Sequence, residues 1–171
     1  HTDVVKYLVD CGSNINKENG DGYTPLIYAF LGGYVNMIEY LMERGAHINK
    51  KLINEHNLLF EPCKEGHITV VKYLVERGVS ININNDKGET LLFNVCKSGN
   101  VNIVKYLVEQ GVNINKENNE GETVLFNACS NGNVNLVKYM YFLIQKEKEL
   151  KQHLWMVIYL IVLRKIEQEN Y

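Results

Sequence analysis

The residues of this chain that could do chemistry are its cysteines and histidines. Cys63 and His67 stand four residues apart, a spacing that could place two metal ligands on one face of a helix. Gly66 interrupts a helix between them, and no second pair of ligands follows. The remaining histidines, at positions 1, 47, 56 and 153, form no cluster. We therefore expect no metal site.

The chain also lacks the patterns of hydrolytic and phosphate-binding sites. A hydrolytic triad requires a nucleophile, a base and an orienting group that meet in a pocket, and a shallow stack of repeats, which the sequence indicates below, offers no obvious one. Gly32-Gly33 is not followed by the Lys and Ser/Thr of a phosphate-binding loop and is instead typical of a helix end. We expect a protein that is not an enzyme and that needs no cofactor.

Three cysteines, Cys63, Cys96 and Cys129, recur at equal intervals in the sequence. On equivalent packed helices they would stand roughly 8 to 10 Å apart, beyond the limit of about 7 Å between Cα atoms for a disulfide. We expect them to be buried as small apolar side chains, and Cys11, outside the series, to be a surface thiol. This cysteine usage, with no Asn-x-Ser/Thr sequon, favours an intracellular, cytoplasmic location.

The charge balance is close to neutral, with 18 Lys and Arg against 20 Asp and Glu and a net charge of −2. It predicts no strong field for nucleic acid or anionic lipid. A content of 46% apolar residues with 2 Pro argues for an ordered chain with a core. The apolar block 154–163 would span about 15 Å as a helix, half of a bilayer core of about 30 Å, so we expect no transmembrane span.

An internal repeat of 33 residues governs the sequence. The tyrosines at 7, 40, 73, 106 and 139 keep this step, and each is followed by Leu or Met. Two independent series of glycines keep it as well, at 12, 45, 78 and 111 and at 33, 66, 99 and 132. Such self-similarity is the signature of a solenoid, in which each unit buries its apolar face against its neighbours.

One period reads as two short helices and a turn. Thr24 has the hydroxyl of an N-cap, and Pro25 fits the first helical position, where its missing N–H costs nothing. The apolar side chains that follow predict a first helix of about two turns, which Gly33 ends. A second apolar stripe predicts a helix from Val35 to the stop at Gly45, and Asn and Gly then indicate a hairpin.

These motifs resemble ankyrin repeats. The matching residues are Gly22-Tyr23-Thr24-Pro25-Leu26, Gly66-His67 and Gly45-Ala46. The resemblance implies an all-α ankyrin-repeat solenoid of helix-turn-helix units with β-hairpin or turn connections, followed by a C-terminal helical tail. We expect an array over 1–145, made of a half repeat at 1–18 and repeats at 19–51, 52–84, 85–117 and 118–145, and a tail at 146–171.

The sequence departs from the family pattern in two ways. The histidine of the family's Thr-Pro-Leu-His signature is replaced by Ile27, Phe60, Phe93 and Phe126, and we expect aromatic packing between adjacent repeats in place of its polar link. The repeat at 52–84 has Pro62 late in its first helix, where an interior proline costs on the order of 3 kcal/mol. We expect a kinked or shortened helix there, and the weakest repeat of the array.

The period stops after Met140, and no Gly or Pro occurs from Val134 to Tyr171. We expect the last helix to continue through about Glu149. Three interpretations of the tail remain open: a terminal helix folded onto the last repeat as a cap, which we rank first, an oligomerising or membrane-surface helix, and an altered reading frame. Oligomerisation through the tail is not favoured.

The repeated residues of the second helices are interpreted as structural. Each tyrosine ring is expected to pack between repeats with its hydroxyl at the surface. A lysine precedes the tyrosine in four of the units, and weak ion pairs with glutamates four residues later, as between Lys72 and Glu76, are the simplest interpretation. We expect no nucleic-acid binding.

The resemblance places recognition on the hairpin tips and on the exposed side of the first helices. Positions that vary there are available for a partner, whereas repeated positions support stacking. Acidic tips outnumber basic ones, which favours a partner with a basic or mixed patch. The tip residues implied are Asp21, Tyr23, Asn54, His56, Asp86, Lys87, Glu89, Glu120 and Glu122, and the helix residues are Leu31, Lys64, Glu65, Lys97, Ser98, Ser130 and Asn131.

The resemblance thus implies a non-catalytic scaffold that binds a protein or peptide partner on this concave surface. Tyr23 and Leu31 are the expected apolar anchors, because binding energy concentrates in a few buried groups. The alternative is a targeting or substrate-recognition segment of a larger enzyme, ligase adaptor or channel whose activity lies outside these residues. Self-assembly through the apolar block 154–163 is a third hypothesis.

Overall fold

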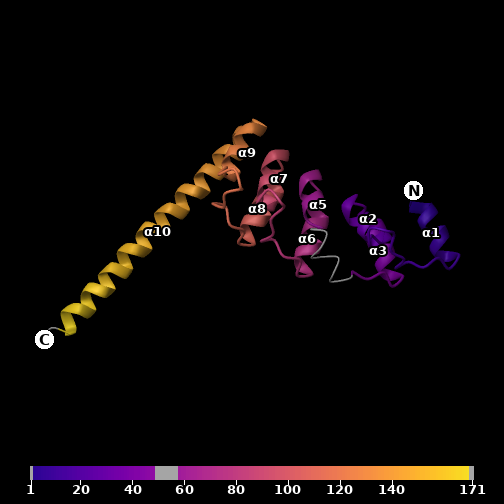
Figure 1. The fold of residues 1–171 in the computed structure, drawn as a ribbon, viewed down its shortest axis with the longest axis horizontal. Coiled ribbons are helices and arrows are strands. Elements are labelled where there is room, and N and C mark those ends of the chain that lie inside the picture. Colours follow the sequence, from indigo (N-terminus) through magenta and orange to yellow (C-terminus); the bar gives the residue numbers. More distant parts are fainter. Residues whose placement is uncertain (1, 49–57, 170–171) are drawn as a thin grey trace.

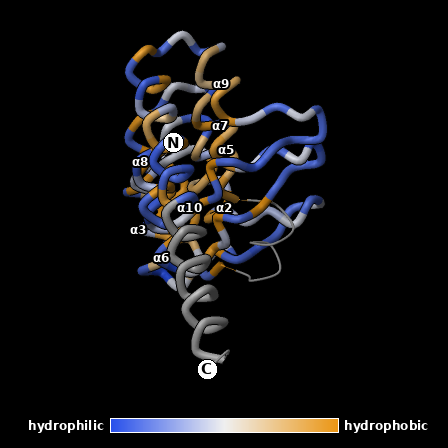
Figure 2. Tube along the Cα trace, turned by 90° about the vertical axis from the view of Figure 1, so that its left-hand side faces the viewer, coloured by the Kyte–Doolittle hydropathy of each residue, from blue (hydrophilic) through white to orange (hydrophobic). Residues whose placement is uncertain are grey.

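The protein is a row of helix pairs stacked side by side, with hairpins along one side (Figures 1 and 2). The computed structural model describes the backbone of residues 2–48 and 58–169, and the side chains of this part up to Gln152. The helices are α1 (Thr2–Asp10), α2 (Pro25–Leu31), α3 (Val35–Glu43), α5 (Phe60–Glu65), α6 (Ile68–Glu76), α7 (Leu91–Ser98), α8 (Val101–Glu109), α9 (Val124–Asn131) and α10 (Val134–Glu169).

The helices form two layers. In Figure 2 the first helices of the repeats, α2, α5, α7 and α9, lie next to the projecting hairpins, and the second helices α3, α6 and α8 lie on the other side. Within the described residues the hairpins form two isolated antiparallel bridges, one between Asn84 and Thr90 and one between Glu117 and Thr123. The predicted all-α repeat solenoid is confirmed.

The helix boundaries follow from residues that the sequence places there. Thr24 caps α2, since its hydroxyl accepts the N–H of Ile27 at 3.4 Å, and Pro25 takes the first helical position. Gly99 and Gly132 end α7 and α9 with φ of 77° and 78°, a left-handed conformation that favours glycine. The predicted helix starts and stops are confirmed at these positions.

The core runs through the stack between the two layers and between neighbouring first helices. Phe30 of α2 and Phe93 of α7 are fully buried, as are Leu74 of α6 and Leu107 of α8. α7 packs against α5 on one side and against α9 on the other. Each interior repeat therefore buries its apolar residues by means of both neighbours.

Four of the repeated tyrosines, those at 40, 73, 106 and 139, pack against the core as predicted, whereas Tyr7 is 68% exposed and the prediction is wrong for it. The ammonium group of Lys72 lies 5.5 Å from the ring centroid of Tyr106 in the next repeat, and that of Lys105 lies 5.8 Å from the ring of Tyr139. Such cation–π contacts stabilise by roughly 0.5–1 kcal/mol at exposed sites. Among the described residues these two lysines form no ion pair, so the expected pairing with the glutamates four residues later is wrong.

The first helix of the repeat at 52–84 is shortened, as predicted, because Pro62 has no N–H for the carbonyl of Leu58. α5 spans six residues and starts at Phe60, whereas α7 spans eight. Pro62 therefore lies in the first turn of α5, where a backbone N–H has no partner within the helix. The expected penalty for an interior proline does not apply here. That this repeat is the weakest of the array stays a prediction.

The tail does not cap the stack. α10 continues without a break from Val134 to Glu169, across the predicted boundary at residue 145, and extends away from the other helices (Figure 1). A return onto the last repeat would need a chain reversal, and the sequence of α10 contains no Gly or Pro to start one. The continued helix is confirmed, but the cap that we ranked first is wrong.

Two of the three periodic cysteines are buried as predicted, and the third is not. Cys63 and Cys96 are free and buried, whereas Cys129 is free and exposed. Cys129 lies on α9, the first helix of the last repeat, whose outer side α10 leaves uncovered. The expected burial of Cys129 is wrong. Residues at the same position of the repeat are equally buried only where another repeat packs against them. Cys11 is exposed, as predicted.

Candidate functional site

Each of the three hairpin tips that the structure describes, 19–23, 85–89 and 118–122, folds around the side chain of one asparagine. Asn85 Oδ1 accepts the backbone N–H of Lys87 at 3.1 Å and that of Glu89 at 3.0 Å. Asn85 Nδ2 donates to the Glu89 carboxylate at 2.7 Å. Side chains of Asn commonly stabilise turns in this way, by bonding to the backbone two residues ahead. The loop 85–89 is therefore held by its own residues.

The next hairpin repeats this geometry. Asn118 Oδ1 accepts the N–H of Glu120 at 3.0 Å and that of Glu122 at 2.8 Å, and Asn118 Nδ2 donates to the Glu122 carboxylate at 2.9 Å. Glu89 and Glu122 are half-buried as a result. Their carboxylates hold the loops, and the residues between them and the asparagines form the exposed tips.

The first hairpin uses an aromatic residue in place of the glutamate. Asn19 Oδ1 accepts the N–H of Asp21 at 3.0 Å and that of Tyr23 at 2.8 Å, whereas Asn19 Nδ2 donates to the hydroxyl of Tyr28 at 3.1 Å. The rings of Tyr23 and Tyr28 lie 5.6 Å apart between centroids. This tip therefore has the aromatic ring of Tyr23 at the position where the other two have the carboxylates that hold the loop.

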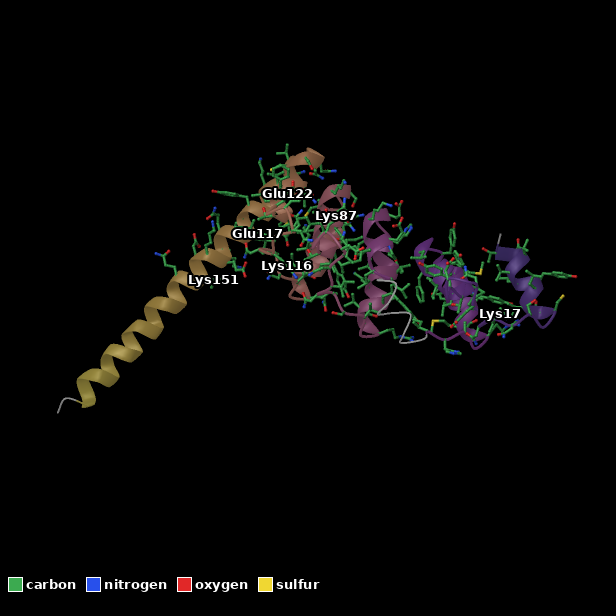
Figure 3. The ribbon with its side chains drawn as sticks, in the orientation of Figure 1. Lys17, Lys87, Lys116, Glu117, Glu122 and Lys151 are labelled. Atoms are coloured by element: carbon green, nitrogen blue, oxygen red, sulfur yellow. The ribbon has the colours of Figure 1, made fainter. Side chains whose placement is uncertain are left out.

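Neighbouring tips are joined to each other. Asn119 donates its backbone N–H to the carbonyl of Lys87 and its side-chain amide to the carbonyl of Asp86, both at 3.0 Å. Gly88 permits this approach, because a Cβ there would lie 2.4 Å from the Asn119 side chain. Figure 3 labels Lys87 and Glu122, which lie on these two joined hairpins. The two tips thus form one continuous surface.

The first helices extend this surface inward from the tips. Asn131 of α9 donates its side-chain amide to the carbonyl of Lys97 in α7 at 3.0 Å. Ser98 and Ser130 each donate a hydroxyl hydrogen bond to a carbonyl of their own helix, at 3.1 and 3.0 Å. We name the hairpin face as the described tips 19–23, 85–89 and 118–122 together with the exposed residues of α2, α5, α7 and α9.

Lys64 on α5 is engaged in ion pairs. Its ammonium group lies 2.9 Å from the Glu61 carboxylate and 3.4 Å from that of Glu65. The hydrogen bond to Glu61, followed by the one to Glu65, raises the pKa of Lys64 above its usual value. Exposed pairs of this kind contribute little to stability. On this helix the charges are therefore partly neutralised.

The structure places the predicted partner-binding residues in three groups. Tyr23, Leu31, Glu89 and Glu122 are half-buried, and Leu31 packs against the core. Asn54 and His56 lie outside the described residues. The exposed group comprises Asp21, Lys64, Glu65, Asp86, Lys87, Lys97, Ser98, Glu120, Ser130 and Asn131.

Sequence reasoning missed the asparagines that hold the tips. Asn19, Asn85 and Asn118 precede the threonine caps by a constant interval, and in two of the three cases a glutamate follows four residues later. That spacing was the available signal, since Asn is the residue that most readily folds such a turn. These side chains add to backbone hydrogen bonds that also close the tips, such as the one from the Gly88 N–H to the carbonyl of Asn85 at 2.9 Å.

An apolar hollow of about 430 Å³ opens beside the first hairpin, between α1 and the pair α2–α3. Its lining contains no charged side chain, so it offers no general base. Its lining residues are Thr2, Val5, Pro25, Tyr28, Ala29, Tyr34, Met37 and Leu41. A surface of this composition suits an apolar side chain of a partner.

The buried thiols are poor nucleophiles. Burial raises the pKa of Cys63 and of Cys96 to about 12, so both are protonated at neutral pH. Within the described residues no group of three or more His, Cys, Asp and Glu could hold a metal ion. Nor does any helix of the part that the structure describes combine the length and apolar content of a membrane span.

The stacked helix pairs with joined hairpins define a helical repeat protein whose hairpins lie on one side. Residues 1–52 and 59–153 match the family model of ankyrin repeats in three copies, and the chain therefore belongs to the ankyrin-repeat family. Ankyrin repeats generally mediate protein–protein interaction, and the family is typically non-catalytic. A search of curated proteins finds no match to the chain.

Proposed function

We propose that the hairpin face binds a protein or peptide partner and that the chain acts as a scaffold without chemistry. The observation that carries this proposal is that some residues of a tip hold the loop while others are exposed to solvent. Asn85 and Glu89 hold the loop, and Asp86 and Lys87 between them are exposed. Fixed loops with free side chains bind with little backbone movement, which lowers the entropic cost of association.

The charge of the face favours a partner with a basic or mixed patch. Asp21, Asp86 and Glu120 are exposed acids on the tips, against the single exposed base Lys87 on the same three described tips. Charge complementarity of this kind steers the encounter and selects among partners. Tyr23 and Leu31 supply the apolar contacts at the N-terminal end of the face.

Charge reversal on the hairpin face tests the proposal. Affinity capture with the intact chain is compared with capture by an Asp86→Lys, Glu120→Lys variant, in which both altered residues are exposed. We expect the variant to bind its captured partner at least about tenfold more weakly, because like charges then oppose a basic patch.

A matched control changes the charge equally on the opposite side. Glu76→Lys, Glu109→Lys alters two exposed residues at the ends of α6 and α8, in the layer away from the hairpins. It should capture the same partner as strongly as the unaltered chain. Equal capture by both variants, or a loss in the control, would contradict the proposal.

A further inference from the structure

α1 has the sequence of a buried second helix, but its apolar residues are exposed. Val4-Val5-Lys6-Tyr7-Leu8 recurs without change as Val70-Val71-Lys72-Tyr73-Leu74 in α6. Val70 and Leu74 are 1% and 0% exposed, whereas Val4 and Leu8 are 58% and 48% exposed. α6 is covered by α5, the first helix of its own repeat, and the described part of the chain holds no such helix for α1. The same five residues are therefore buried only where a first helix packs on them.

The apolar hollow of about 430 Å³ lies where a first helix would cover α1. An interior first helix is bounded by the second helix of its own repeat and by the first helix of the next one, as α5 is by α6 and α7. The hollow has the same two boundaries, since it is lined by Val5 of α1 and by Tyr28 and Ala29 of α2. Figure 1 shows α1 at the N-terminal end of the row, beside α2 and α3. The surroundings of the hollow are therefore those of a first helix.

Tyr34, in the lining of the hollow, holds a position that contacts a preceding first helix in the later repeats. His67 and Asn100 stand at the equivalent positions. A Cβ at Gly33 would lie 2.5 Å from the His67 ring, and a Cβ at Gly66 would lie 2.6 Å from the Asn100 side chain. These two glycines follow the first helices α2 and α5. Tyr34, 63% exposed, is therefore placed to contact a glycine at the end of an occupying helix.

Tyr28 holds a second position of this kind. Its equivalent in the last repeat is Asn127, whose side-chain amide donates to the carbonyl of Phe93 in the preceding first helix at 3.3 Å. Tyr28 is 53% exposed and has no preceding helix among the described residues to contact. Glu61 and Asn94 hold the position in the repeats between. Both tyrosines thus replace polar residues, which makes this end of the stack suited to an apolar occupant.

The start of α1 adds a charge to the site. Asp3 is exposed in the first turn of α1. Two residues separate the end of α7 from the start of α8, so the last turn of a first helix lies beside the first turn of its second helix. α5 and α7 carry Lys64 and Lys97 in that last turn. Asp3 therefore favours an occupant with a basic residue in its last turn. Uncharged residues hold the position of Asp3 in the later repeats: Asn36, Thr69, Asn102 and Asn135.

We propose that the hollow binds an amphipathic helix of a protein partner, about two turns long, with a basic residue in its last turn and a glycine after it. The site goes beyond the proposed function, since Tyr28 is the one lining residue that also belongs to the hairpin face. A second folded copy of the chain does not supply the helix from the described residues. Its first helices have their inner sides buried in their own stack, as Leu26 of α2 and Leu91 of α7 show.

A synthetic peptide with the sequence of residues 89–99 tests the proposal, because it holds α7 with its Thr90 cap, Lys97 and the closing Gly99. The labelled, reduced peptide is titrated with the full chain and followed by fluorescence anisotropy. Saturable binding of one peptide per chain is expected. Helical circular dichroism should increase on binding, because a peptide of this length is not stably helical alone. Absence of binding, or binding without a gain of helix, would overturn the proposal.

Two variants of the chain locate the peptide. Tyr34→Ser should weaken binding at least about fivefold and leave the fold intact, because Tyr34 is exposed at the N-cap of α3, where serine is favoured. Phe126→Glu, on the outer side of α9, should bind the peptide as strongly as the unaltered chain. A loss confined to Phe126→Glu would place the peptide at the other end of the stack and overturn the proposal.

A charge exchange tests the orientation of the helix. Asp3→Lys should weaken binding about three- to tenfold, and a Lys97→Glu peptide should restore it with this variant. Glu76→Lys makes the same charge change at the end of α6 and should bind the unaltered peptide normally. Equal binding of the unaltered peptide to Asp3→Lys and to the unaltered chain would overturn the proposal. The hairpin variant Asp86→Lys, Glu120→Lys should also bind the peptide normally, so the two proposals can fail separately.

Discussion

The interior repeat formed by α7 and α8 and the last repeat formed by α9 and α10 have nearly the same residues and different environments. Phe93 and Cys96 are buried in the first, and Phe126 and Cys129 are exposed in the second. The helices themselves are equally long, since α7 and α9 each span eight residues. The role of a repeated residue is therefore set by the neighbour that stacks against it, not by the repeat alone.

The largest expected effect separates these two phenylalanines. Phe93→Ala should lower the free energy of unfolding by about 3–5 kcal/mol, because it leaves a cavity between α7 and α9. Phe126→Ala should change it by less than about 1 kcal/mol, since the ring is mostly in water. Urea unfolding of both variants in monomeric samples measures the difference. Equal losses would show that the end of the stack is covered.

A smaller effect distinguishes the two joined hairpins. Asn85→Ala leaves the N–H groups of Lys87 and Glu89 without their acceptor and should destabilise the loop by on the order of 1–3 kcal/mol. Amide exchange should become faster in both tips, because Asn119 bonds to the carbonyls of the altered loop.

Asn118→Ala is the matched variant in the last repeat. It should speed exchange at Glu120 and Glu122 and leave the tip 85–89 nearly unchanged, because that tip is held by its own asparagine. If both variants sped exchange equally in both tips, the prediction that the two tips depend on each other unequally would be wrong.

The smallest effect is a pH dependence of the stacked tyrosines. Burial, and then the charge of Glu76, raises the pKa of Tyr106 above its usual value, and burial with Glu109 does the same for Tyr139. A raised pKa in the folded state means that the stabilisation is fully present below the pKa of the unfolded tyrosine, near 10, and is lost as the pH rises through the folded value.

Unfolding free energies measured at several pH values from neutral to strongly alkaline check this dependence. The decrease at alkaline pH should be smaller for Tyr106→Phe, in which nothing ionises at that position. Tyr7→Phe is the control, since Tyr7 is mostly exposed. An identical alkaline decrease in the unaltered chain and in Tyr106→Phe would show that stacking does not protect this hydroxyl.

Much of the fold could be predicted from the sequence because local chemistry decides it. A helix starts where the hydroxyl of Thr24 can cap it and the ring of Pro25 fits its first position. Helices end where glycine can adopt a left-handed conformation, at Gly99 and Gly132, and neither effect depends on the neighbouring repeats. The 33-residue period then fixes which apolar residues face each other. It also predicted the packing of four of the five repeated tyrosines, but not the exposure of Tyr7 or the lysines that cover the rings of Tyr106 and Tyr139.

The errors have one physical origin. The period predicts where a residue lies within its repeat, but not whether another repeat packs against it. Cys129 follows the period and is exposed because no repeat stacks on α9 in the described part of the chain. Pro62 was placed in a helix interior, yet α5 starts at Phe60. The shape of the candidate site was missed for a related reason. Asn85 and Asn118 hold the tips through hydrogen bonds to backbone N–H groups, and these groups come within reach only in the folded loop.

Reactivity of the four thiols tests the stacking account most directly. The intact, folded chain is treated with a maleimide at a concentration low enough for it to be monomeric, and labelling at each cysteine is followed by mass spectrometry. Cys11 and Cys129 should react fully before Cys63 and Cys96 react at all, because the latter two are buried and their pKa values of about 12 leave almost no thiolate. Protection of Cys129 equal to that of Cys96 would contradict the account, since the last repeat would then be covered like an interior one.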